Sequence, residues 1–519
     1  MLIKIHSAAP LGINAVPITI EVHTKLGFCF TLVGLPDIAV KESHERIMAA
    51  INVGEFQYVR RSFTINMAPA DIKKEGSSFD LPLAIGILAG GETVKTKLLK
   101  DYMIMGELSL DGSLQPIKGV LPIALCAKEM GLKGIILPEA NAAEAAVVDG
   151  IEVYGLHSLL EVVRFLNGEQ QYTPTHVDIQ ELYDKLAFCS DLDFADVRGQ
   201  FKVRRAIEVA AAGGHNIIMV GPPGAGKSMI AKRLPSILPP LSLAEALETT
   251  KIHSVAGLMS KYTEGNSSLI VQRPFRSPHH TITDVALAGA GTNPRPGEIS
   301  LAHNGVLFLD ELAEFKRSAL EVLRQPLEDK KITIARSKTT VEYPASFMLV
   351  AAMNPCPCGH YGENNPAHPC VCTPAQIHRY LGRVSGPLLD RIDIHCEIEA
   401  VPYEQLRDIK PGESSAVMRE RVLKARAIQQ NRFQANPLIH CNAMMTSKMI
   451  RQYCPIDKEC DELLQLTMTK LGLSARAYDR ILKVARTIAD LEGSEHILKN
   501  HLLESISYRG LDRSAWARG

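Results

Sequence analysis

Two short motifs contain the residues of this sequence that are best suited to chemistry. Residues 221–228 read GPPGAGKS, and residues 306–311 read VLFLDE. The first motif has the spacing G-x-x-x-x-G-K-[ST] of a phosphate-binding loop, and apolar runs lie on both sides of it, as a strand–loop–helix unit requires. The second is a hydrophobic strand that ends in two adjacent carboxylates. In this order the two motifs predict hydrolysis of a nucleoside triphosphate.

The phosphate loop is predicted to bind ATP through its backbone and through one lysine. Glycines let the chain turn tightly and aim successive N–H groups at phosphate oxygens, and the following helix adds the positive end of its dipole. We expect Lys227 to reach the β- and γ-phosphates. The predicted ATP-binding residues of the loop are Gly221, Pro222, Pro223, Gly224, Ala225, Gly226, Lys227 and Ser228.

The hydroxyl of the loop and the carboxylates of the second motif predict a magnesium site beside an attacking water. Ser228 and Asp310 supply the oxygen ligands that Mg²⁺ prefers, Asp310 directly or through water. Glu311 follows at once and is placed to polarise the attacking water as a general base. The alternative, a glycine-rich turn before an ordinary buried strand, does not explain why both motifs fit their contexts.

Length and composition place the chain among globular α/β proteins. Its 519 residues are too many for one hydrophobic core, so we expect about three domains. Apolar stretches such as 81–89 are too short to cross a bilayer, and no signal peptide is recognisable at the start. Eleven cysteines, an odd number, fit a reducing cytoplasm. The net charge is zero, so nucleic-acid binding would need a local basic patch.

Changes in composition and hydrophobic periodicity divide the chain into segments. The predicted segments are an N-terminal domain at 1–167, a linker at 168–193, an ATPase core at 194–405 and a helical C-terminal domain at 406–519. Strand patterns occur at 18–22, 28–33 and 62–66, and helical patterns at 39–51, 117–130, 416–431 and 479–491.

Two features around the motifs resemble the ATPase site of AAA+ proteins. A buried-type strand at 348–353 ends in Asn354. This asparagine resembles the sensor-1 residue, which holds the lytic water or senses the γ-phosphate. Residues 196–200 lie where such proteins contact adenine, and Val197 is the residue that the resemblance assigns to that contact.

Two arginines resemble residues that complete an AAA+ site. Residues 386–393, GPLLDRID, resemble the arginine-finger segment of the helicase and chelatase branches. Arg391 would reach the γ-phosphate of a neighbouring subunit and neutralise charge in the transition state. Arg476 opens a C-terminal helix and is preferred over Arg480 as the sensor-2 arginine. A finger that acts in trans requires a ring or filament of subunits.

The segment between the two phosphate motifs has a signature of its own. RPFRSPHHT at 273–281 and PRPGEIS at 294–300 resemble the helix-2 insert of the clade that contains MCM helicases and magnesium chelatases. His279 and His280 are either metal ligands or a pair with a pore-loop or structural role, and the second interpretation is favoured.

A hairpin pattern follows the second motif. Residues 331–342 alternate like two strands around a basic tip and resemble the pre-sensor-1 hairpin, which points into the pore of ring helicases. Arg336 and Lys338 would then follow a DNA phosphate backbone without reading bases. A solvated hairpin without DNA contacts is an equally open interpretation.

Long motifs extend the resemblance to the whole chain. RPFRSPHHT, PRPGEISLAHNGVLFLDEL, NPCPCG, SGPLLDRID and VGLPDIAVKESHERI resemble the ComM/YifB family of magnesium-chelatase-like AAA+ proteins. The resemblance implies an α/β fold, in which an AAA+ P-loop ATPase core with a helical C-terminal lid follows an N-terminal Lon-protease-like α+β domain.

The same resemblance implies a function and partners. It implies a homo-hexameric ATP-dependent DNA helicase whose competence members drive branch migration during natural transformation. Single-stranded, forked or branched DNA would be the substrate, with a recombinase or loader as a further partner and no membrane. The alternative is a chelatase-like remodelling ATPase that acts on a protein partner.

Four cysteines directly after Asn354 predict a metal site. Two C-x-C pairs flank a loop rich in Gly, His and Pro, and four thiolates at this spacing can close a tetrahedral structural zinc site. His360 or His368 are alternative ligands, and four free thiols are the alternative to a site. The predicted ligands are Cys356, Cys358, Cys370 and Cys372.

The N-terminal domain resembles a Lon-type protease without its base. Residues 68–90 resemble the nucleophile segment, with Ser78 in the place of the nucleophile, and 106–121 match the segment that supplies the lysine. Leu121 occupies the place of that lysine. A serine needs an adjacent base to attack at neutral pH, so we expect no proteolysis. Lys74 is expected to be a solvated surface lysine, with DNA contact as the alternative.

Overall fold

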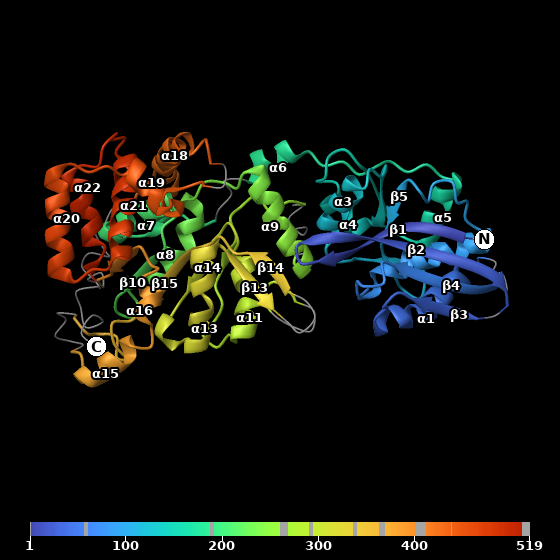
Figure 1. Cartoon of the computed structure of the whole chain (residues 1–519), viewed down its shortest axis with the longest axis horizontal. Coiled ribbons are helices and arrows are strands. Elements are labelled where there is room, and N and C mark those ends of the chain that lie inside the picture. Colours follow the sequence, from blue (N-terminus) through green and yellow to red (C-terminus); the bar gives the residue numbers. More distant parts are fainter. Residues whose placement is uncertain are drawn as a thin grey trace. The chain divides into compact units, whose positions relative to one another are not determined.

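The chain forms two compact units (Figure 1). Unit 1 comprises Met1–Lys185 and Leu243–Val271, and unit 2 comprises Leu186–Ser242 and Gln272–Gly519. The computed structural model describes residues 2–27, 29–54, 56, 61–186, 191–259, 268–289, 294–335, 340–362, 369–399, 412–436 and 439–510. The four segments drawn from the sequence stay a prediction; part of the expected ATPase core, Leu243–Val271, belongs to unit 1.

Unit 1 is built on a mixed seven-stranded sheet of order β3-β4-β2-β1-β5-β8-β9. β2 pairs antiparallel with β1 and with β4, and the other neighbours pair parallel. A separate two-stranded ladder joins β6 and β7. The strands are β1 (Leu2–Leu11), β2 (Asn14–Leu26), β3 (Phe30–Val33), β4 (Arg61–Ala68), β5 (Tyr102–Ile104), β6 (Glu107–Leu108), β7 (Leu114–Gln115), β8 (Gly134–Pro138) and β9 (Glu152–Leu156).

Helices cover this sheet, and α2 is the most deeply buried of them. Every residue of α2 is buried, and the helix packs against β1 and β2. Gly86 permits that approach, because a Cβ there would lie 2.7 Å from Cγ2 of Val22. The helices of unit 1 are α1 (Ile38–Val53), η1 (Ser77–Phe79), α2 (Asp80–Gly90), α3 (Val120–Glu129), α4 (Glu139–Ala145), α5 (Leu159–Asn167), α6 (Ile179–Leu186, whose last residue is in unit 2) and α9 (Leu243–Ala256).

Helix α9 joins unit 1 by packing against α3. The N–H of Gly119, which precedes α3, donates to the carbonyl of Ser254 at 3.1 Å. The buried carboxyl of Glu144 lies at the start of the same helix, where its Oε1 accepts from the N–H of Leu121 at 3.0 Å. Burial raises the pKa of Glu144. The contact between α3 and α9 is therefore partly polar and hydrogen-bonded.

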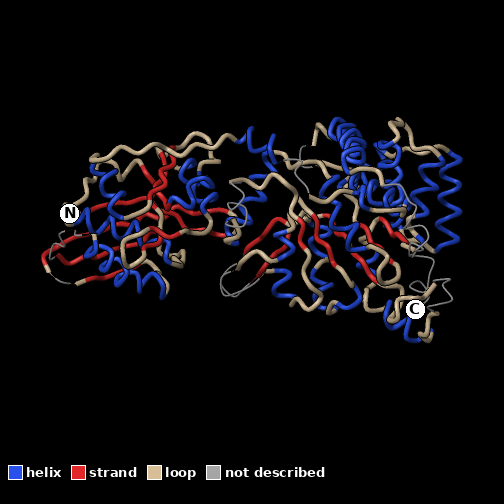
Figure 2. Tube along the Cα trace, turned by 180° about the vertical axis from the view of Figure 1, so that it is seen from behind, coloured by secondary structure: helices blue, strands red, loops and turns tan. Residues whose placement is uncertain are grey.

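Unit 2 is built on a five-stranded sheet of order β11-β12-β15-β10-β16, and all its neighbours pair parallel. The three central strands, β12, β15 and β10, are buried along their whole length, as parallel strands covered on both faces require. The sheet strands and the antiparallel hairpin of β13 and β14 are red in Figure 2. They are β10 (Ile217–Val220), β11 (Phe275–Arg276), β12 (Val306–Leu309), β13 (Lys331–Ala335), β14 (Thr340–Pro344), β15 (Met348–Met353) and β16 (Ile394–Glu397).

The helices of unit 2 form a group around the sheet and a group at the C-terminal end of the chain. Residues of α18 and α21 share one hydrophobic core with the strands and with α7, and α19 to α22 enclose a second, smaller core. The first group contains η2 (Phe194–Asp196), α7 (Phe201–Gly213), α8 (Lys227–Arg233), η3 (Leu234–Ile237), α11 (Asp284–Ala288), α12 (Glu298–Leu301), η4 (Leu312–Glu314), α13 (Arg317–Val322), α14 (Arg324–Asp329), α15 (Pro374–Leu381) and α16 (Gly386–Leu389). The C-terminal group contains α18 (Ser415–Arg432), η5 (Asn442–Met444), α19 (Ser447–Tyr453), α20 (Lys458–Leu471), α21 (Ala475–Leu491) and α22 (Lys499–Ser507).

Every element expected from periodicity is present. Each of the three strand patterns falls on a strand, and each of the four helical patterns falls on a helix. The mixed α/β class is confirmed. In the part of the chain that the structure describes, no helix combines the length and the apolar character needed to cross a membrane.

Candidate active site

The order of the strands brings the two phosphate motifs together. The phosphate loop follows β10, the two carboxylates follow β12, and Asn354 follows β15, which lies between them in the sheet. Because the strands are parallel, their carboxyl ends meet at one edge, where α/β proteins bind ligands. The predicted nucleotide-binding residues therefore converge on one place in unit 2.

The phosphate loop has the backbone conformation that its glycines allow. Gly224 and Gly226 have φ angles of 77° and 86°, and Gly226 is the N-cap of α8. Gly221 is required for space, because a Cβ there would lie 2.3 Å from the carbonyl oxygen of Ile398. The loop thus leads from a buried strand directly to a helix N-terminus, where backbone N–H groups favour phosphate.

Lys227 lies folded over its own loop. Its Nζ donates to the carbonyls of Gly221 at 2.6 Å and Pro222 at 2.8 Å, and to Oδ1 of Asn354 at 3.0 Å. Burial lowers the pKa of Lys227, and the charges of Asp310 and Glu311 act in the opposite direction. The ammonium group and the predicted sensor asparagine are therefore in contact at the place expected for a γ-phosphate.

Ser228 and Asp310 are also in contact. The Ser228 hydroxyl donates to Oδ2 of Asp310 at 2.5 Å, and Oδ1 of the same carboxylate accepts from the N–H of Glu311 at 3.0 Å. A hydroxyl and a carboxylate oxygen side by side match the hard, oxygen-only ligand set of Mg²⁺. These residues fit the magnesium ion that the motifs imply.

Glu311 has a partner that the sequence did not predict. It has a φ of 53° at the end of β12, and its side chain is 57% exposed. Its Oε2 lies 3.1 Å from Nδ1 of His280, whose ring packs against that of His279 at 4.1 Å between centroids. The histidine pair therefore contacts the proposed general base. The metal alternative for the pair has no support, because the one group of potential metal ligands found among the described residues is formed by cysteines.

The two predicted arginines meet at one carboxylate. Nη2 of Arg391 lies 2.5 Å from Oε1 of Glu328, and Nη2 of Arg476 lies 3.8 Å from the same oxygen. The Arg391 side chain is 10% exposed, whereas that of Arg476 is 60% exposed. Within the described residues, no ion pair links either arginine to Asp310 or Glu311. The arginines are close to each other, and their ion-pair partner is Glu328.

Arg480, the other candidate for the sensor-2 residue, has a structural partner. Its Nη1 donates to Oδ1 of Asp393 at 3.3 Å, and the pair joins α21 to the segment after α16. Burial alone would raise the pKa of Asp393, but His215, whose Nδ1 lies 3.6 Å from Oδ2, and the charge of Arg480 lower that pKa well below its usual range. Asp393 is therefore a buried carboxylate whose charge is balanced within the fold.

Val197 is buried in the core of unit 2, and its N–H donates to the carbonyl of Phe194 at 3.0 Å. Nearby, Nε2 of Gln200 donates to the carbonyl of Glu399 at 2.7 Å. The adenine contact assigned to Val197 stays a prediction. Arg336 and Lys338, the predicted DNA contacts, lie outside the described residues, although the strands β13 and β14 on either side of them pair as expected.

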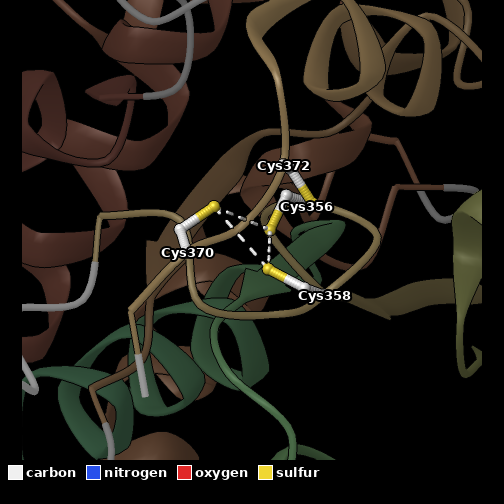
Figure 3. Close-up of side chains that lie close together, drawn as sticks. All are labelled: Cys356, Cys358, Cys370 and Cys372. Atoms are coloured by element: carbon white, nitrogen blue, oxygen red, sulfur yellow. Dashed lines mark hydrogen bonds between the residues drawn. The ribbon is translucent and has the colours of Figure 1, made fainter. Parts of the chain in front are cut away.

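The four predicted cysteine ligands come together after β15, and Figure 3 shows their sulfur atoms facing one another. Sγ of Cys356 lies 3.3 Å from that of Cys358 and 3.8 Å from that of Cys370, and the latter two are 3.6 Å apart. All four sulfurs, including that of Cys372, lie within 4.8 Å of one another. Tetrahedral zinc with Zn–S bonds of about 2.3 Å places sulfurs about 3.8 Å apart.

The electrostatics of the cluster also suit a cation. The backbone N–H of His360 donates to the sulfur of Cys358 and, with that of Val371, lowers the pKa of this thiol to about 6. At Cys370 and Cys372 a backbone hydrogen bond also lowers the pKa, but burial and the neighbouring thiols raise it overall, a mutual repulsion that a bound cation would relieve. Thiolates are the form that binds metal. The cluster lies beside the phosphate loop, because a Cβ at Gly359 would be 2.6 Å from Cδ of Pro223. The alternative ligand His360 is not part of the cluster, and His368 lies outside the described residues.

The residues of the Lon-like motif do not form a nucleophile and base. Ser78 lies in η1 and is partly exposed, and Leu121 is fully buried in α3. An apolar side chain in the place of the lysine cannot take the serine proton. The expectation for Lys74 was wrong. This lysine is fully buried, its Nζ donates to the carbonyl of Pro69, and burial lowers its pKa.

Comparisons with known proteins agree with this site. The family described as magnesium chelatase, subunit ChlI, matches residues 193–406, its C-terminal family matches 412–509, and the family described as subunit ChlI of Mg-chelatase matches 20–141. The first match contains the phosphate loop, the two carboxylates, Asn354, the cysteine cluster and Arg391.

Individual proteins are similar over almost the whole chain. Competence protein ComM of Haemophilus influenzae is 44% identical over 512 residues, which are 98% of this chain and 97% of that protein. The uncharacterized protein YifB of Escherichia coli is 44% identical over 514 residues, with the same coverage. Lon protease 2 of Bacillus subtilis is 31% identical over 116 residues, 22% of this chain and 21% of that protein. With these identities over nearly full length, the chain belongs to the ComM/YifB family of magnesium-chelatase-like AAA+ ATPases.

Proposed function

We propose that this protein is an ATP-driven, ring-forming motor that moves DNA strands or junctions. The observation that carries the proposal is that the phosphate-site residues and the two arginines have different partners within one subunit. The phosphate-site residues converge at one sheet edge, whereas Arg391 and Arg476 pair with Glu328. A site that lacks its arginines within one subunit can be completed by the arginines of the next.

The residues of the site have distinct parts in hydrolysis. Ser228 and Asp310 would hold magnesium, which would supply positive charge to neutralise the phosphates. Lys227 exchanges its carbonyl partners for phosphate oxygens, and Asn354 orients the water or the γ-phosphate. Glu311 takes the proton of that water once its carboxylate leaves His280. The helices α18 to α22 are assigned as the lid of this site, in keeping with the match of the C-terminal family.

A ring or filament of subunits follows from a finger that acts in trans, since every site then needs a neighbour, and the family resemblance assigns a homo-hexameric ring. In such a ring Arg391 approaches the γ-phosphate of the adjacent subunit, where a cation stabilises the charge of the transition state. The hairpin of β13 and β14 is assigned to the pore, where Arg336 and Lys338 contact the DNA backbone.

The name of one relative supports a biological setting. The protein from Haemophilus influenzae is called a competence protein. We assign the motor to branch migration during natural transformation, in the cytoplasm. Its substrate would be single-stranded, forked or branched DNA, and a recombinase or loader would be a further partner. Unit 1 is assigned a non-proteolytic role in assembly or in guiding DNA, because Leu121 cannot act as a base. Structural zinc in the cysteine cluster holds the loop beside Pro223.

A remodelling ATPase with a protein substrate is the second candidate. It is favoured by the family matches, all three of which bear the name of a magnesium chelatase subunit. Strand-displacement and branch-migration assays on forked and four-way DNA, with ATP and with a non-hydrolysable analogue, separate the two. A DNA motor should produce displaced strands or migrated junctions with ATP but not with the non-hydrolysable analogue. Hydrolysis without any strand movement on these substrates would favour the protein substrate.

A further inference from the structure

Helix α14 connects the two arginines to the hairpin. Glu328 lies one residue before the end of α14, and β13 begins at Lys331. The carboxylate of Glu328 is the common partner of Arg391, at 2.5 Å, and of Arg476, at 3.8 Å. A single carboxylate between two guanidinium groups leaves one positive charge unbalanced. The pair of arginines therefore favours a more highly charged anion, such as a triphosphate, over Glu328.

The base of the hairpin meets the finger segment a second time at Lys330. This residue is the C-cap of α14, with a φ of 57°, and its carbonyl accepts from the N–H of Ala345 at 2.8 Å, just after β14. Burial lowers the pKa of Lys330, and Asp393 and Arg480 lie close enough for their charges to act on it. Two residues at the base of the hairpin thus face the segment that contains Arg391.

The backbone and the side chain of Arg391 are held by different parts of the unit. Its carbonyl accepts from Nδ2 of Asn216 at 3.0 Å, and the following residue, Ile392, accepts from Nη1 of Arg509 at 2.7 Å. Its guanidinium donates to the carbonyl of Pro387 at 2.6 Å and pairs with Glu328. The backbone is therefore fixed to the sheet and to the C-terminal part of the chain, while the side chain can exchange Glu328 for another anion.

We propose that Glu328 is a positioning residue that holds Arg391 and Arg476 until a neighbour's nucleotide takes them, and that its release moves the hairpin of β13 and β14. The inference rests on the proposed function, because it needs a neighbouring subunit with bound ATP. When phosphate oxygens bind the arginines, Glu328 loses both partners, and α14 loses its ion-paired link to the finger segment. The hairpin, which is separated from the end of α14 by Lys330 alone, is then free to shift. Nucleotide binding at one subunit boundary is thereby linked to DNA contact.

The test replaces Glu328 with glutamine in the full-length protein and measures ATP hydrolysis with and without forked DNA. Without DNA we expect the rate of Glu328→Gln to rise about two- to fivefold, the factor that corresponds to one partly exposed ion pair. The stimulation by DNA should fall toward a ratio of one. Asp329→Asn removes the same charge from the next residue of α14 and should behave as the wild type. Glu328→Asp keeps the charge on a shorter side chain and should lie between the two.

The outcomes separate this inference from the proposed function. A Glu328→Gln protein with wild-type rates in both conditions, or a basal rate that falls while its circular dichroism stays unchanged, would overturn the inference. A wild-type enzyme whose hydrolysis ignores DNA and which moves no strands would overturn the DNA motor and the link to the hairpin. A raised basal rate in Glu328→Gln would in that case still support release of the arginines.

Discussion

Replacing Asn216 with alanine should destabilise unit 2 and displace Arg391, the proposed arginine finger. Asn216 is buried just before β10, and its side chain joins two backbone groups. Its Nδ2 donates to the carbonyl of Arg391 at 3.0 Å, and its Oδ1 accepts from the N–H of Leu349 at 2.9 Å. Alanine would leave both groups without that partner. At about 1–3 kcal/mol for each buried group, the free energy of unfolding should fall by about 2–6 kcal/mol.

Calorimetry can measure this loss. The transition of unit 2 is the one that ATP with Mg²⁺ raises, because a ligand stabilises the unit that binds it. For a unit of this size the lower end of the range corresponds to a fall in Tm of at least about 3 °C. Steady-state hydrolysis should show a lower kcat with little change in the KM for ATP, since the amide that anchors the backbone of Arg391 is lost while the phosphate loop is intact.

Two further variants test whether the loss of stability comes from the two hydrogen bonds of the Asn216 side chain. Asn216→Asp keeps an acceptor for the N–H of Leu349 but loses the donor to the carbonyl of Arg391. It also brings a second carboxylate near Asp393, so it should destabilise unit 2 at least as much as Asn216→Ala does. Asn431→Ala removes an exposed asparagine of α18 and should change the free energy of unfolding by less than about 0.5 kcal/mol. A Tm of Asn216→Ala within the error of the wild type, or an equal loss in Asn431→Ala, would refute this account.

The remaining predictions concern the base, the DNA contact and the metal. Glu311→Gln should bind ATP yet hydrolyse it at least about 100-fold more slowly, and a wild-type rate would show that another group is the base. Arg336→Ala combined with Lys338→Ala should weaken DNA binding and flatten its dependence on salt while basal hydrolysis stays intact; unchanged affinity would remove the hairpin from the DNA path. Elemental analysis should find zinc in the purified protein and less of it in Cys370→Ser, with Cys454→Ser as the control. Protein without bound metal would decide against the cluster as a zinc site.

Sequence motifs identified the residues of the nucleotide site because each one lies beside a feature with local meaning. Lys227 and Ser228 follow a glycine loop, and Asp310 and Asn354 each follow an apolar run. Such runs are buried parallel strands, and their carboxyl ends meet at one edge of the sheet. Spacing could not supply the neighbour relations of the strands, so the contact of Lys227 with Asn354 comes from the structure alone.

The contacts that sequence analysis missed join residues far apart in the chain and follow no periodic pattern. Glu328 and His280 are ordinary polar residues in the sequence, and each becomes important only through the residue that it faces. Helix α9 is a similar case. Its buried face includes polar residues such as Thr249 and His253, so apolar periodicity could not reveal which unit it joins. Lys74 was expected at the surface because lysines are seldom buried.

The functional groups of the site share one property: each has a partner within its own subunit. Lys227 contacts Asn354, Glu311 contacts His280, and Arg391 contacts Glu328. In the proposed ring, ATP and a neighbouring subunit would act on this site by replacing existing contacts, and each replacement would free a residue that had been held. A ligand shifts a structure only by binding one arrangement more tightly than another. The replacement of these contacts within the subunit is therefore the step at which binding can be converted into movement. The residues freed would be His280, by an exchange at Glu311, and Glu328, by an exchange at Arg391. Because these two residues lie in different parts of the fold, nucleotide binding within a subunit and at its boundary should have separable effects.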